Sequence, residues 1–140
     1  MVHKRILVWL NDSSTSVKAL REAICLAKEY GAQLDTLTVE TAPHYPGAVG
    51  EVVEATEAST RKYDKLAETA QEVAKQSDFN LRSHLAFGSK AKTFKEFIEK
   101  NGVDLLVLGY AGRSALYERT IGSTFQSLVR LAPCAVLVVK

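Results

Sequence analysis

The stretch DLLVLG, residues 104–109, begins with an aspartate, continues with four apolar residues and ends in a glycine. Similar runs recur as RILVWL over 5–10, LDTLTV over 34–39 and CAVLVV over 134–139. Runs that are rich in Val, Ile and Leu and lack regular polar alternation are typical of strands covered on both faces. We therefore predict that these runs form buried strands of a mostly parallel sheet.

Segments with helical spacing separate the runs. Leu20, Ile24 and Ala27 fall on one face of a predicted helix that ends near Gly31, where glycine can adopt the left-handed conformation. The longest predicted helix covers about 50–76. These helices supply the crossovers that a parallel sheet needs between successive strands.

Two shorter helices and a weaker strand complete the pattern. One helix is predicted to stop at Gly102, and the last one before Pro133. The stretch FNLRSHLAF, residues 79–87, alternates apolar and polar residues and indicates a strand nearer an edge. Strands and helices thus alternate, which predicts an α/β fold: a three-layer, open, doubly wound sheet of mostly parallel strands with helices on both faces.

Composition supports a single domain over residues 1–140 and narrows the partners. Apolar residues make up 46% of the chain, and the net charge of +2 comes from interspersed rather than clustered charges. The sequence therefore predicts neither a basic nucleic-acid face nor, without an apolar run of about 20 residues, a membrane span. The two cysteines lie far apart and outside any CxxC motif, and we expect a cytoplasmic protein.

The glycine that ends the opening run begins a second pattern. Gly109, Gly112, Gly122 and Ser123 have the spacing G-x2-G-x9-G-S. A glycine at the end of a strand lets a ligand approach the backbone, and a helix starting at Ser123 would present unpaired N–H groups to an anion. The hydroxyls of Ser123 and Thr124 would add donors. The pattern indicates a phosphate-binding loop.

An explanation without a ligand fits the same residues. Ser123 and Gln126 match a capping box, in which the two side chains satisfy the start of the helix, and Gly109 and Gly112 could serve only as turn residues. The chain has neither the P-loop pattern nor the G-x-G-x-x-G dinucleotide fingerprint. Spacing alone leaves phosphate binding and capping both open.

Fold geometry indicates where such a loop would act. In open α/β sheets, ligands bind beyond the carboxyl ends of the strands, where the strand order reverses. The loop NDSSTS, residues 11–16, and the glycine loop follow the two most apolar strands and would be neighbours there.

Three stretches resemble the universal stress protein family, and the similarity covers essentially the whole length. The family opening ILVxxDGSxxSxxAL is matched by ILVWLNDSSTSVKAL at 6–20, and its closing APCPVLVV by LAPCAVLVVK at 131–140. The glycine pattern is that of the ATP-binding branch of the family. The resemblance implies the strand order 3-2-1-4-5 and a site for ATP, with or without Mg²⁺.

Carried over position by position, the resemblance implies that the backbone at Val39 meets adenine, that the residues after the first strand meet the nucleoside, and that the glycine loop holds ribose and phosphates. An arginine in that loop could close on a phosphate. The residues expected to bind ATP are Asn11, Asp12, Ser13, Val39, Gly88, Gly109, Gly112, Arg113, Gly122, Ser123 and Thr124.

Some positions depart from the family pattern. Asn11 stands where the family has an aspartate, although Asp12 follows it, and Ala111 replaces a frequent His or Arg. Lys90 and Lys92 stand in place of the family's Pro and Glu, where they would either help hold phosphates or be solvated.

No general base is identifiable, because His3, His44 and His84 are scattered without an acid partner at meaningful spacing. We therefore expect a nucleotide-dependent switch or sensor in the stress response, with hydrolysis very slow at most. The alternatives are an adenine-nucleotide hydrolase of related architecture and a nucleotide-free interaction protein. The resemblance also implies a homodimer formed through the last strand, Ala135–Val139.

Overall fold

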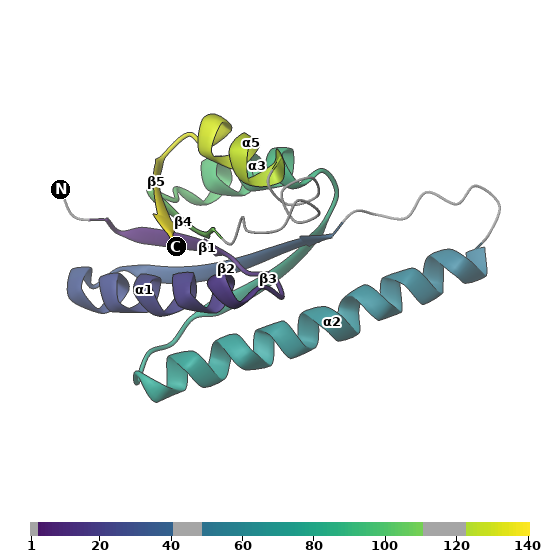
Figure 1. The fold of residues 1–140 in the computed structure, drawn as a ribbon, viewed down its shortest axis with the longest axis horizontal. Coiled ribbons are helices and arrows are strands. Elements are labelled where there is room, and N and C mark those ends of the chain that lie inside the picture. The colour runs from purple at the N-terminus through teal and green to yellow at the C-terminus, as the bar shows by residue number, and fades with distance from the viewer. Residues whose placement is uncertain (1–2, 41–48, 111–122) are drawn as a thin grey trace.

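The computed structural model describes residues 3–40, 49–110 and 123–140, with the side chains of all of these except residues 49–59 and Ser123. Strands and helices alternate along the chain, as the sequence predicts (Figure 1). The elements are β1 (Arg5–Trp9), α1 (Ser14–Tyr30), β2 (Gln33–Glu40), α2 (Val49–Gln76), β3 (Arg82–Phe87), α3 (Lys90–Asn101), β4 (Leu105–Gly109), α5 (Ser123–Leu131) and β5 (Ala135–Val139).

The five strands form one parallel sheet in the order β3-β2-β1-β4-β5, which confirms the expected fold and strand order. The central strand β1 pairs Ile6 with Leu34 of β2 on one side and with Leu105 of β4 on the other. Because β1 is flanked in this way, the chain winds outward in both directions from the middle of the sheet. The outer strands are β3 and β5.

Helices cover both faces of the sheet, with α1 and α2 on one side and α3 and α5 on the other (Figure 1). Alternate residues of β1 separate the two apolar clusters: Val8 packs toward α1, while Leu7 and Trp9 pack toward α3 and α5. The cluster on the α3 side includes Phe94, which lies edge-on to Trp9 at a centroid distance of 6.1 Å. The runs that form β1, β2 and β4 are therefore buried on both faces, as predicted. The prediction is wrong for the run at 134–139, because β5 lies at the edge of the sheet and is only half-buried.

The predicted ends of α1 and α3 are confirmed, because Gly31 and Gly102 both cap their helices in the left-handed conformation. The strand expected over 79–87 is shorter and begins at Arg82. The residues just before this strand close the end of α2 instead. Asp78 has a φ of +52°, and the amide of Phe79 donates to the carbonyl of Ala74 at 2.9 Å. A helix cap that closes in this way takes the backbone donor of Phe79 away from the sheet.

No helix in the described part of the chain is long and apolar enough to cross a membrane.

Candidate functional site

The carboxyl edge of the sheet, where β1 and β4 end side by side, is the point at which the winding direction changes. The loop at residues 11–13 leaves β1 here and leads into α1. Gly109 ends β4, and the amide of Tyr110 donates to the carbonyl of Val139 at 2.8 Å, so the chain still follows β5 as it leaves the sheet. The structure thus brings the loop after β1 next to Gly109, the first residue of the second segment that the sequence predicts to be its neighbour.

The turn between β1 and α1 is held by its own polar side chains. Asn11 Oδ1 accepts from the amide of Ser13 at 2.9 Å, and Ser13 Oγ accepts from the amide of Ser16 at 3.2 Å. The Ser16 hydroxyl oxygen in turn accepts from the amide of Asn11 at 3.0 Å. Ser13 is therefore the N-cap of α1, and Asp12 projects from the turn without capping the helix.

Gly109 is needed for packing between β4 and α1. A Cβ atom at this position would collide with the carbonyl of Thr15 and would lie 2.9 Å from the amide nitrogen of Ser16. Both groups belong to backbone in the first turn of α1, which cannot move aside as a flexible side chain can. This part of the glycine pattern has a structural reason that involves no ligand.

Val39 and Gly88 lie at the same edge, on β2 and just beyond β3. The Val39 side chain is buried among the apolar residues under α3 and α5, so only its backbone can face a ligand. The amide of Gly88 donates to the carbonyl of Glu40 at 2.9 Å, and its φ of +146° lies in a region that favours glycine. The chain thus turns at Gly88 from β3 toward α3.

A lysine of α2 reaches this edge across the end of β2. Lys62 Nζ lies 3.4 Å from Asp12 Oδ2 and 3.9 Å from Glu40 Oε1. The sequence did not predict Lys62 or Glu40 as site residues. Their contact depends on the angle at which α2 crosses the sheet, which no local pattern in the sequence indicates.

The start of α5 lies beside the end of β4. Tyr110 packs its ring on Phe125 with a centroid distance of 5.1 Å. Thr124 is half-buried in the first turn, and Ser123 is the first residue of α5. The expected site residues Gly112, Arg113 and Gly122, and the Ala111 departure, lie outside the described residues, as does the side chain of Ser123.

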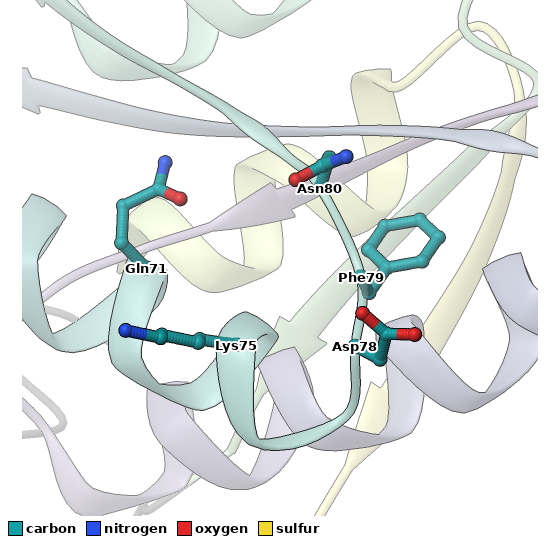
Figure 2. A pocket seen from close by; sticks show the side chains of 5 residues that line it. All are labelled: Gln71, Lys75, Asp78, Phe79 and Asn80. Carbon is teal, nitrogen blue, oxygen red and sulfur yellow. The ribbon is translucent and has the colours of Figure 1, made fainter.

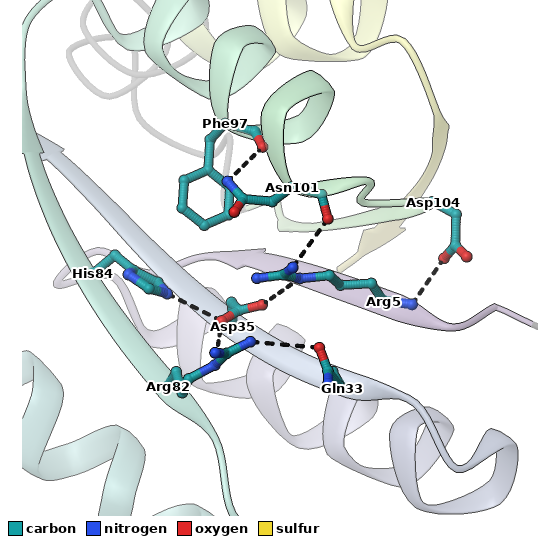
Figure 3. A network of polar contacts seen from close by, with 8 residues as sticks. All are labelled: Arg5, Gln33, Asp35, Arg82, His84, Phe97, Asn101 and Asp104. Carbon is teal, nitrogen blue, oxygen red and sulfur yellow. Dashed lines mark hydrogen bonds and ion pairs between the residues drawn. The ribbon is translucent and has the colours of Figure 1, made fainter.

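The opposite, amino edge holds a polar network that the sequence reasoning missed (Figure 3). Asp35 of β2 is fully buried, and its carboxylate lies 3.0 Å from Arg5 Nε, 3.3 Å from Arg82 Nε and 3.0 Å from His84 Nε2. Arg5 also donates to the carbonyl of Asn101 at 3.0 Å, which joins the end of α3 to the sheet.

The expectation that the histidines lack acid partners is therefore wrong for two of them. His84 pairs with Asp35, and His3 Nδ1 lies 3.4 Å from Asp104 Oδ1. Both carboxylates are distant in sequence and reach the histidines only through strand register. His44 lies outside the described residues.

A hollow of about 350 Å³ lies at the end of α2, lined by Gln71, Lys75, Asp78, Phe79 and Asn80 (Figure 2). Gln71 Nε2 donates to the carbonyl of Leu81 at 3.3 Å, so part of this polar lining is already bonded. In residues 3–40, 49–110 and 123–140, no group of three or more His, Cys, Asp or Glu residues is placed to hold a metal ion. The carboxyl edge, where the turn after β1 and the end of β4 lie side by side, remains the stronger candidate site.

A family model for universal stress proteins matches residues 3–140. The chain belongs to the universal stress protein family. Its relatives include the universal stress protein YxiE of Bacillus subtilis, which is 30% identical over 145 residues that cover 97% of this chain and 98% of YxiE. The solved structure of the universal stress protein UspA from Lactobacillus plantarum is 28% identical, covers 100% of this chain and 99% of its own, and superposes with a TM-score of 0.84.

More distant universal stress protein structures share the fold. An Arabidopsis thaliana family member with AMP bound is 15% identical, covers 98% of this chain and 91% of its own, and has a TM-score of 0.70. Structures with the same fold have also been solved in complex with cAMP and with dAMP. In the present universal stress protein, Lys92 lies 4.0 Å from Glu96 on an exposed helix surface, an arrangement typical of solvated charges.

Proposed function

We propose that this universal stress protein binds an adenine nucleotide, ATP, at the carboxyl edge of its sheet and acts as a nucleotide-dependent switch or sensor in the stress response. The residues proposed to line the site are those expected from the sequence: Asn11, Asp12, Ser13, Val39, Gly88, Gly109, Gly112, Arg113, Gly122, Ser123 and Thr124. The complexes of distant family members with AMP, cAMP and dAMP support the adenine-nucleotide class.

The observation that carries the proposal is the charge at the helix starts. Helices α1, α3 and α5 have no acidic residue in their first turns. Asp and Glu are favoured there, because each stabilises the positive end of the helix dipole by about 0.3–1 kcal/mol. Helices α1 and α5 begin beside the ends of β1 and β4, and without acidic residues in their first turns their dipoles can favour a phosphate at this edge.

For Mg²⁺, the described part of the edge offers the carboxylates of Asp12 and Glu40, which both lie near Lys62. Mg²⁺ is usually held by one or two carboxylates together with phosphate oxygens and water. The residues therefore fit an ion that arrives with the triphosphate, and Asn11 adds no negative charge. Bound Mg²⁺ would neutralise phosphate charge.

The direct test is calorimetric titration of nucleotide-stripped protein with ATP, AMP and cAMP, with and without Mg²⁺. We expect saturable binding near one ATP per chain, and hydrolysis far slower than one turnover per second. Product analysis after long incubation separates slow ATPase activity, which yields ADP, from a hydrolase that yields AMP. No heat beyond dilution, under conditions able to detect an affinity of about 100 μM, would overturn the proposal and favour an interaction protein.

Ser123→Ala decides between the two explanations of the glycine loop. If the hydroxyl donates to a phosphate, the affinity for ATP falls while the melting temperature of the free protein changes little. If Ser123 only caps α5, the free protein loses about 1 kcal/mol of stability and the affinity is retained.

We also propose a cytoplasmic homodimer that pairs through β5. Among the strands that the structure describes, β5 pairs with β4 alone, and its residues 136–139 are half-buried. Since the carbonyl of Val139 accepts from Tyr110, the backbone groups of Val138 point away from β4. Val138→Pro should therefore yield monomers in sedimentation experiments while leaving the β4 pairing intact, whereas a wild-type chain that sediments as a monomer would contradict the dimer.

A further inference from the structure

Within the part of α2 whose side chains the structure describes, Lys62 is the basic residue that reaches the carboxyl edge. It lies between two acidic side chains from different segments. Asp12 belongs to the turn after β1, and Glu40 ends β2 next to Val39. The side chains are 49% exposed for Lys62, 65% for Asp12 and 25% for Glu40. These partly solvated charges can exchange partners when a ligand arrives.

The packing of α2 fixes the end of the helix and so sets the side of the sheet on which Lys62 lies. From residue 60 onward, the buried side chains of α2 are Ala70, Val73 and Ala74, all in its last two turns. The end of the helix is fixed further by Lys28 Nζ, which donates to the carbonyl of Ser77 at 2.6 Å. The helix is therefore anchored at its last turns, near the amino edge, and its earlier part lies toward the carboxyl edge, where Lys62 meets Asp12 and Glu40 (Figure 1).

The charges of the three side chains matter for an anionic ligand. The two carboxylates and one ammonium carry a net charge of −1, and without Lys62 the same place would carry −2. A nucleoside is neutral, whereas ATP carries several negative charges, so an added negative charge at the edge repels ATP and leaves adenosine almost unaffected. At separations near 10 Å, physiological salt weakens this repulsion but does not abolish it.

We propose that Lys62 is a specificity-determining residue of the nucleotide site, which lets the edge keep Asp12 and Glu40 next to the nucleoside and still accept a phosphorylated ligand. This inference rests on the proposed function. Lys62 acts through the acids that it neutralises, and its effect grows with the number of phosphates on the ligand.

The test compares ATP, AMP and adenosine as calorimetric ligands for the wild type, Lys62→Gln and Lys62→Arg. Lys62→Gln should weaken ATP binding about three- to tenfold, weaken AMP binding less and change adenosine binding less than twofold. Lys62→Arg keeps the charge and should restore the affinity for ATP. The effect of Lys62→Gln on ATP should shrink in high salt, because salt screens the repulsion between the uncompensated carboxylates and the phosphates.

Lys75→Gln is the matched control. It makes the same charge change in the same helix, but thirteen residues away, which is about 20 Å along an α-helix and beyond the screening length. It should leave the affinity for all ligands unchanged. Equal losses for ATP and adenosine in Lys62→Gln, or equal effects of the two lysine variants on ATP, would overturn this inference alone. A wild type that binds neither ATP nor adenosine would overturn the proposed function and this inference with it.

Discussion

At the amino edge of the sheet Asp35 is fully buried and surrounded by three basic side chains, whereas at the carboxyl edge Asp12 and Glu40 share one exposed lysine. The amino edge satisfies its charge with side chains from β1, β2 and β3, and so fixes the register of these strands. The carboxyl edge is held by backbone contacts, at Gly109 against α1 and at Gly88 against Glu40, and by short side-chain bonds within the turn after β1.

The difference teaches how one sheet can combine stability with binding. A buried carboxylate that already has three partners has little capacity left for a ligand. Positive helix ends and exposed charges can bind a ligand without disrupting the apolar core. Four substitutions can break or sharpen this comparison.

The largest effect is expected for Asp35→Ala. Removing the buried carboxylate leaves Arg5, Arg82 and His84 without their common partner and should lower the free energy of unfolding by about 3 kcal/mol in urea titrations. Asp104→Ala is the control, because Asp104 is part-exposed and accepts from the amides of Lys4 and Arg5. It should cost about 1 kcal/mol. Equal losses would mean that the buried network contributes no more than a surface contact.

Gly109→Ala tests the backbone contact at the carboxyl edge. The added methyl group meets the backbone of Thr15 and Ser16 and should lower the free energy of unfolding by about 2 kcal/mol. Gly102→Ala has no atom within 4 Å of the new Cβ and should cost about 1 kcal/mol, for its left-handed conformation alone. Chemical denaturation measures both. A smaller loss at Gly109 than at Gly102 would show that β4 and α1 separate without cost.

Ser13→Ala should cost about 1 kcal/mol of stability, because the Ser13 hydroxyl caps α1 through the amide of Ser16. Ser89 is the matched control: it occupies the N-cap of α3 without a side-chain capping bond. Ser89→Ala should therefore change the free energy of unfolding by less than about 0.5 kcal/mol. Similar losses for the two variants, measured by urea denaturation, would argue against the capping role of Ser13.

The smallest effect is a gain at the amino edge. Asp78 follows α2 with a φ of +52°, which glycine adopts at less cost, so Asp78→Gly should stabilise the protein by about 0.5 kcal/mol. The neighbouring Ser77→Gly gains no such relief and should be neutral or destabilising. Thermal unfolding of both variants gives the comparison, and a lower melting temperature for Asp78→Gly would contradict it.

Local sequence signals predicted most of the fold. The run at 104–109 marks β4, and the positions of Gly31 and Gly102 mark the ends of α1 and α3, because strand burial and helix capping depend on nearby residues. The start of β3 was misplaced, since an aspartate in the left-handed conformation, rather than a glycine, closes α2.

The candidate site was predictable only in part, because its contacts are not local. The two loops could be placed at one edge from the alternation of strands and helices. The partners of Asp35 and His84 depend on register between strands that are 49 residues apart, and the reach of Lys62 to Asp12 depends on a helix crossing. No spacing within a single segment encodes either contact.

The central position of β1 has a consequence for synthesis of the chain. This strand is made first, yet its pairing with β4 begins only at Leu105. A ribosome that adds about 5–20 residues per second leaves that side of β1 without its strand partner for about 5–20 seconds. Throughout that interval the nascent chain presents Ile6, Leu7 and Val8 on an incomplete sheet, whose open strand edge and apolar surface favour aggregation.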